Sequence, residues 1–123
     1  MEMLAYWSDA ALLRGLEGEV YTILALTTSM EGEPLRPYTK PEVYAVCMTL
    51  IRISDMVDRL SEDVEALHPR VRWDEIATIG GGYALYPLSI DVEEMFAFIE
   101  EVMPDFYIQI LAMIDMYADD EIC

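Results

Sequence analysis

The spacing of the apolar residues is the feature that most constrains the fold of this chain. They recur every three or four residues from Val43 to Leu60, from Leu12 to Ile23 and from Val92 to Tyr117. Side chains at this spacing share one face of an α-helix, and no segment shows the sustained alternation that marks a half-buried strand. The sequence therefore predicts an all-α protein, an antiparallel four- to five-helix bundle formed as one domain by residues 1–123.

The first two helices have recognisable boundaries. Ser8 is a good N-cap, and Thr39 with Glu42 forms a capping-box pattern after a loop rich in Gly and Pro. We expect the second helix to end near Leu67, because the residue before Pro69 is disfavoured in a helical conformation.

The later boundaries follow from glycine, serine and proline. A short helix is expected from Trp73 to about Ile79, ended by the three glycines of residues 80–82, which disfavour helix. Ser89 is the expected cap of the next helix. Pro104 either opens a further helix or kinks one long helix. The residues expected to face the core here are Val92, Met95, Phe96, Ile99, Phe106, Tyr107, Ile110, Leu111, Ile114 and Tyr117.

The charge is extreme for a domain of this size. Seven Lys and Arg stand against 24 Asp and Glu, giving a net charge of −17, and the stretch from Trp73 to Cys123 has twelve acids and no Lys, Arg or His. A hydrophobic fraction of 54% argues against disorder. Such a surface repels nucleic acid and anionic membranes, and favours basic partners, cations or simply solubility. We therefore expect no nucleic-acid ligand.

Cysteine usage and the N-terminus predict a compartment. Cys47 lies in an apolar helical pattern and is expected to be buried, and Cys123 is the last residue, so no disulfide framework is indicated. There is no positively charged segment followed by an apolar one at the start, and no apolar run approaches roughly 18 residues. The prediction is a cytoplasmic protein without a membrane contact.

An ordered set of short motifs runs from about Ile51 to Met113 and resembles the HepT-like (DUF86) family of the HEPN superfamily. The motifs are Arg59-Leu60-Ser61, His68-Pro69 followed by Trp73, Glu75-Ile76-Ala77, Asp91 with Glu93, and Pro104. The first helix fits this family only in length and position.

This resemblance implies a helical bundle that pairs as a homodimer and needs no cofactor or metal. Many members of the family are RNase toxins encoded beside a nucleotidyltransferase antitoxin. Their motif is an Arg followed by a His roughly four to six residues later, commonly continuing as His-x-Tyr. The His moves a proton during RNA cleavage, the Arg holds the phosphate charge, and in some pairs the antitoxin adds AMP to the Tyr.

The chain departs from this motif at every catalytic position. Gly80 stands at the position of the Arg, Leu85 at the His and Pro87 at the Tyr. None of these residues carries a charge, a transferable proton or a hydroxyl, and no basic residue follows Arg72. The resemblance implies an RNase, but the residues at these positions argue against catalysis, so the sequence leaves open whether the chain is an enzyme.

Other candidate residues have simpler interpretations. The single histidine, His68, is expected to be a helix-end residue before a proline, although a catalytic or ligand role is the alternative. Tyr83, Tyr86 and Leu88 lie where active relatives place their chemistry, so they are candidate interface residues, with packing onto the bundle as the alternative. The acidic clusters are expected to be solvated helix faces, and no metal site is predicted.

The sequence thus predicts a catalytically degenerate HepT-like protein that acts by protein–protein binding in a toxin–antitoxin or defence system. The expected partners are a second copy of the chain and a nucleotidyltransferase antitoxin-like protein. Two alternatives stay open: an HEPN-type RNase toxin with an unrecognised site, and an acidic decoy that binds a basic nucleic-acid-binding protein.

Overall fold

The described part of the chain is built from helices. A computed structural model describes residues 8–28, 40–86 and 89–122, with the backbone alone for 117–122. The helices are α1 (Asp9–Thr27), α2 (Lys40–Arg59), α3 (Glu62–Leu67), α4 (Trp73–Leu85) and α5 (Val92–Ile122). The predicted all-α helical bundle is confirmed.

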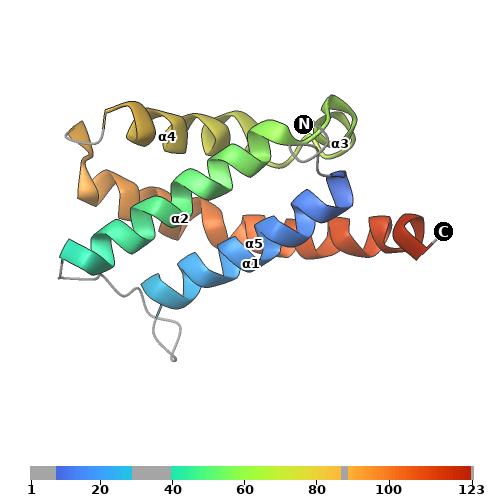
Figure 1. Ribbon diagram of the computed structural model, residues 1–123, viewed down its shortest axis with the longest axis horizontal. Coiled ribbons are helices and arrows are strands. Elements are labelled where there is room, and N and C mark those ends of the chain that lie inside the picture. The colour runs from blue at the N-terminus through green and yellow to red at the C-terminus, as the bar shows by residue number, and fades with distance from the viewer. Residues whose placement is uncertain (1–7, 29–39, 87–88, 123) are drawn as a thin grey trace, which may run out of the picture.

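The four longer helices lie antiparallel to their neighbours. Figure 1 shows α2 between α1 and α4, while α1 also packs against α5. The short helix α3 lies at the end of the bundle where α2 ends and α1 begins. The backbones of α4 and α5 are not closely packed, but side chains of both helices line one surface groove and the Trp73 and Phe106 rings are in contact.

One apolar core holds the four long helices together. It includes fully buried side chains from each of them, such as Leu16, Leu50, Ile76 and Phe106. Burying a side chain of this size contributes roughly 1.5–3 kcal/mol relative to leaving it exposed. Cys47 is buried and free, as predicted. No helix within the described residues is both long enough and apolar enough to cross a membrane.

Ser61 divides the predicted second helix into two. Its hydroxyl accepts from the Val64 amide at 3.3 Å and donates to the Asp9 carboxylate at 2.7 Å, and its own amide donates to Asp9 at 3.0 Å. The prediction of one helix reaching Leu67 is therefore wrong, because Ser61 caps a new helix instead of continuing α2. The end at Leu67, just before His68, is confirmed, as is the cap at Ser8, whose hydroxyl accepts from the Ala11 amide.

The helix that begins at Trp73 continues through the three glycines, contrary to the prediction that they end it. It reaches Leu85, and its turns pack against α2 along one face. The cost of glycine, up to about 1 kcal/mol each, is offset by this tertiary packing. At Gly80 the absence of a side chain allows the backbone of α4 to pack directly against Ser54 and Leu50 of α2.

The last helix is continuous and contains Pro104, so the alternative of a separate fifth helix starting there is wrong. Its cap is Asp91, whose carboxylate accepts from the Glu94 amide at 3.1 Å, and not Ser89 as predicted. Val92 and Leu111 were expected to face the core but are exposed. The other predicted core residues of this helix are buried or half-buried, apart from Tyr117, whose side chain lies outside the described part; Thr39, Pro87, Leu88 and Cys123 also lie outside it.

Candidate functional site

The position that the family resemblance assigns to a catalytic Arg is closed by packing. The Ser54 hydroxyl of α2 donates to the Ile76 carbonyl at 2.6 Å and accepts from the Gly80 amide at 3.0 Å. A Cβ atom on Gly80 would overlap the Ser54 side chain and lie 2.9 Å from the Leu50 carbonyl oxygen. No side chain can therefore stand at residue 80 unless α4 moves away from α2.

The surroundings of Gly80 are acidic. A hollow of about 250 Å³ opens between α2 and α4 beside Gly80 and Gly81, and Asp55 and Asp58 line it. Arg59, which follows Asp58 in the sequence, is paired with Asp55 at 3.1 Å and does not line the hollow. Leu85, at the position that the resemblance assigns to the catalytic His, is 74% exposed at the end of the helix. This arrangement offers a phosphodiester neither a positive charge nor a proton donor.

His68 does not combine with an upstream cation. It caps the end of α3, where its amide donates to the Glu65 carbonyl and its own carbonyl accepts from the Trp73 indole at 2.9 Å. Its Nε2 atom is buried without a hydrogen-bond partner among the described residues. Arg52 pairs instead with Glu19 of α1. The helix-end interpretation of His68 is supported by these contacts.

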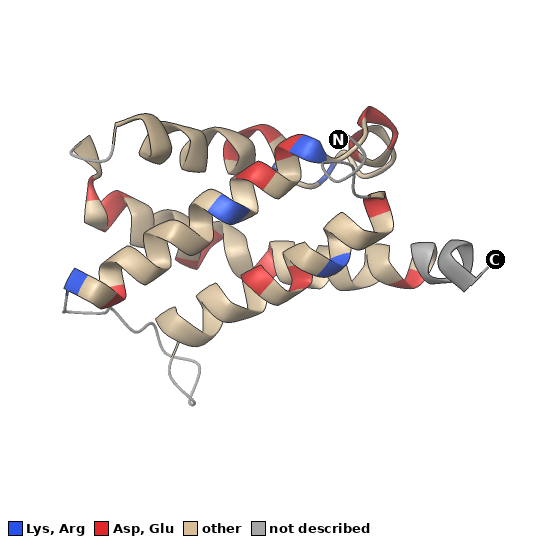
Figure 2. Ribbon diagram, viewed as in Figure 1, with Lys and Arg blue, Asp and Glu red and all other residues tan. Residues whose placement is uncertain are grey.

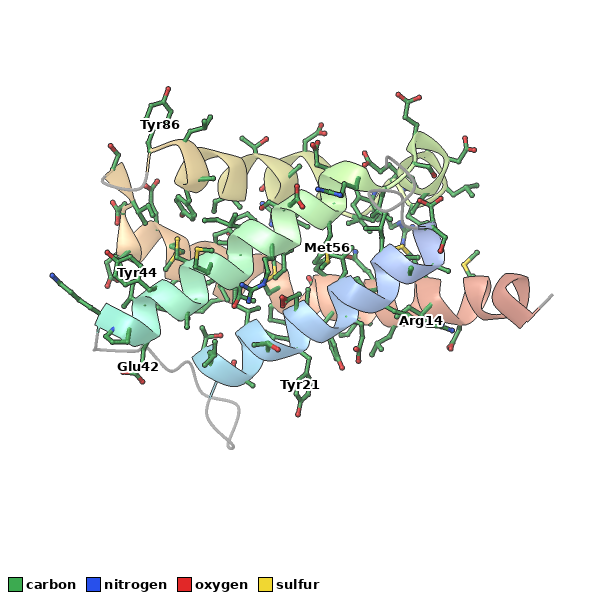
Figure 3. The ribbon with its side chains drawn as sticks, in the orientation of Figure 1. Arg14, Tyr21, Glu42, Tyr44, Met56 and Tyr86 are labelled. Atoms are coloured by element: carbon green, nitrogen blue, oxygen red, sulfur yellow. The ribbon has the colours of Figure 1, made fainter. Side chains whose placement is uncertain are left out.

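The predicted interface tyrosines lie on a groove between α4 and α5. Its volume is about 720 Å³. The residues that line it are Thr78, Ile79, Gly82, Tyr83, Tyr86, Ser89, Glu94, Ala97, Phe98 and Glu101. Tyr86 is 67% exposed, and Figure 3 shows it pointing away from the bundle at the end of α4. Tyr83 is half-buried against the core, so for this residue the alternative of packing onto the bundle holds in part.

The electrostatic setting of the groove is negative. Burial raises the pKa of the Tyr83 hydroxyl, and the nearby Cys47, Glu94 and Asp91 raise it further. The neutral phenol is therefore the form present near pH 7. Glu101, at the other end of the groove, is paired with Arg72 at 3.2 Å.

The C-terminal half of α4 has no charged side chain, although the chain as a whole is strongly charged. From Thr78 to Tyr86 there is no charged residue, and Figure 2 shows this part of the helix without red or blue. A Cβ atom on Gly81 or Gly82 would meet nothing within 4 Å, so α4 presents exposed backbone with open space beside it at these two residues. The sequence pointed to the two tyrosines here, but it did not show that α4 continues through the glycines to form the wall of a groove.

The α5 side of the groove was missed by the sequence analysis. Phe98, Ala97 and Glu94 reach it because α5 begins at its Asp91 cap and runs antiparallel to α4. Their helical spacing could have placed them on one face, but not opposite Tyr83. A second apolar surface lies further along α5, where Ile108 and Met116 are more than half exposed.

Comparison of the chain with family models, with curated proteins and with solved structures finds no significant match. The resemblance to the HepT-like family therefore depends on the residues quoted for it. Within the described part of the chain, no group of three or more His, Cys, Asp and Glu side chains is placed to hold a metal ion.

Proposed function

We propose that this protein is a catalytically degenerate HepT-like member of the HEPN superfamily, and that it acts by binding another protein. The observation that carries the proposal is the α2–α4 contact at Gly80. The catalytic Arg of active relatives is replaced there by backbone packed against Ser54, beside Asp55 and Asp58. Acid–base catalysis alone typically contributes about 10²–10⁴-fold in rate, so a site without these groups loses most of its activity.

Protein binding is supported by the groove between α4 and α5. The groove between α4 and α5 combines aromatic side chains with small residues, and Tyr86 stands exposed at its edge. Exposed aromatic residues on a concave surface are typical anchors of protein interfaces. Tyr83 and Tyr86 of this groove lie in the same segment of the sequence as the motif positions of the resemblance, although Gly80 and Leu85 do not line the groove.

The partner we propose is encoded beside this protein and resembles the nucleotidyltransferase antitoxins of active relatives. The test is co-expression of the chain with the product of the adjacent gene, followed by measurement of mass in solution. A single species that contains both proteins and is heavier than either protein alone is expected. Migration of the two as separate species at micromolar concentration would overturn the proposal.

Self-association is a second part of the proposal. The exposed apolar strip of α5 around Ile108 and Met116 is the surface we assign to it, because exposed apolar area of this kind is stabilised by a partner. A homodimer held by apolar burial keeps its mass at high salt. Ile108→Glu is expected to give a monomer, whereas Asp105→Asn, on the same helix, is expected to leave the dimer intact.

The charge distribution favours a second candidate function, an acidic decoy for a basic nucleic-acid-binding protein. The support is the stretch from Trp73 to Cys123, with its twelve acids and no base. A decoy would lose its partner steeply with added salt, and DNA or RNA would compete with it. A complex that resists both salt and nucleic acid would exclude this candidate.

A further inference from the structure

The groove between α4 and α5 is bounded by contacts at both ends. At one end the Trp73 and Phe106 rings meet edge to face, with centroids 5.9 Å apart, and Arg72 joins Glu101. At the other end the Ser89 amide donates to the Tyr86 carbonyl at 3.0 Å. Between these ends Gly82 and Ala97 are too small to fill the space, so the groove stays open.

The lining of this groove selects for one kind of occupant. Its walls are aromatic, from Tyr83, Tyr86 and Phe98, which suits a large apolar side chain or the face of an Arg guanidinium. Its one carboxylate without a described ion pair is Glu94, near Asp91 at the start of α5. Neither α4 nor α5 carries a single basic residue, so an acidic segment would be repelled.

We propose that the α4–α5 groove binds a helical segment of a partner protein that carries an apolar anchor flanked by Lys or Arg. The inference rests on the proposed binding function and deepens it by naming the site and the chemistry of the partner. The anchor lies over Gly82 between the aromatic walls, and the flanking cations lie against Glu94 and the tyrosine rings. Helix-in-groove recognition of this type uses apolar side chains at helical spacing on one face of the bound helix.

Adjacent glycines provide a matched pair of variants. Gly82 lines the α4–α5 groove, whereas Gly81 lines the hollow on the α2 side, and a Cβ atom at either position meets nothing within 4 Å. Gly82→Leu therefore adds a side chain to the proposed site with a Cβ that meets no neighbour, and Gly81→Leu adds the same side chain to the neighbouring face. Both remove a glycine from the helix, so their effects on helix propensity are equal.

The experiment measures binding of labelled peptides to the purified chain by fluorescence anisotropy. The probe is an amphipathic peptide of about 16 residues, long enough to form helix, with Leu on one face and Lys and Arg beside it. One control peptide has Glu in place of Lys and Arg, and another has Ser in place of Leu. Thermal unfolding of each protein variant confirms that it is folded.

We expect the basic Leu peptide to bind, and both control peptides to bind at least about tenfold more weakly. Gly82→Leu is expected to weaken binding about tenfold, and Gly81→Leu to leave it unchanged. Glu94→Gln weakens binding and reduces its salt dependence, whereas Asp105→Asn, outside the groove, changes neither.

Three results would overturn the inference. The first is absence of binding by the basic Leu peptide, and the second is equal weakening by Gly81→Leu and Gly82→Leu. The third is a chain that dimerises alone and is made monomeric by Gly82→Leu, which would assign the groove to a second copy. The co-expression measurement detects a complex with the adjacent gene product whichever surface holds it, so failure here is distinguishable from failure of the proposed function.

Discussion

At the scale of single residues, the proposed function depends on the close contact between Gly80 and Ser54. The Ser54 hydroxyl uses both its donor and its acceptor capacity inside the α2–α4 contact, on the Ile76 carbonyl and the Gly80 amide. Buried hydroxyl groups are costly unless they are paired in this way. The glycine is therefore required by packing, and under the proposed family assignment it stands where active relatives have a catalytic Arg.

Gly80→Ala is expected to destabilise the protein by about 1–3 kcal/mol, because the added methyl overlaps Ser54 and overpacks the helix contact. Gly81→Ala is the matched control. Its methyl enters open space and lowers the entropy of the unfolded chain, so a gain of about 0.5–1 kcal/mol is expected. Urea unfolding of the two variants measures both values. Equal effects at the two positions would contradict the closed contact at Gly80.

At the scale of elements, the sequence predicted which segments are helical better than where the helices end. The periodic segments of α1, α2 and α5 carry their own pattern, and their existence was predicted from it. The glycines of α4 were misread because local propensity is weaker than packing against α2. The break at Ser61 was missed because its partner, Asp9, lies 52 residues away in the chain. The α4–α5 groove could not be predicted for the same two reasons: it needs α4 to continue through its glycines, and it brings together residues of two separate helices.

Ser61→Ala tests the junction of α1, α2 and α3. It removes the cap of α3 and the hydroxyl bond to Asp9, so we expect a loss of about 1–2 kcal/mol. Ser8→Ala removes the cap of α1 alone and is expected to cost about 1 kcal/mol. In the background of Asp9→Ala, Ser61→Ala is expected to cost less, because the bond to Asp9 is already absent. An additive double mutant, measured by denaturant unfolding, would show that the two residues do not interact.

At the scale of the whole molecule, the net charge of −17 acts on stability as well as on partner choice. Glu65 shows the effect at one position. Its pKa is raised by burial, and the charges of Asp74, Asp58 and Glu62 raise it further. The folded chain therefore holds this proton more tightly than the unfolded chain does.

Stability is expected to increase as the pH falls from 7 toward the ordinary pKa of Glu, about 4.3, since protonation of Glu65 favours the folded state across this window. Thermal unfolding at a series of pH values measures the effect. Glu65→Gln should raise the midpoint at pH 7 and flatten its pH dependence. The exposed residue Asp105 provides the control, because Asp105→Asn removes one charge away from this cluster. A midpoint that falls steadily between pH 7 and 5 would contradict the expectation.

The central proposal is that this chain does not cleave RNA, and its basis is the hollow beside Gly80, which is lined by Asp55 and Asp58 and by no Lys, Arg or His. The most direct measurement is incubation of a molar excess of purified chain with end-labelled RNA of mixed sequence and structure, with a His68→Gln preparation run in parallel. The account predicts no cleavage above buffer, and the same result for both proteins. Cleavage at defined positions by the unaltered chain, lost in His68→Gln, would contradict it.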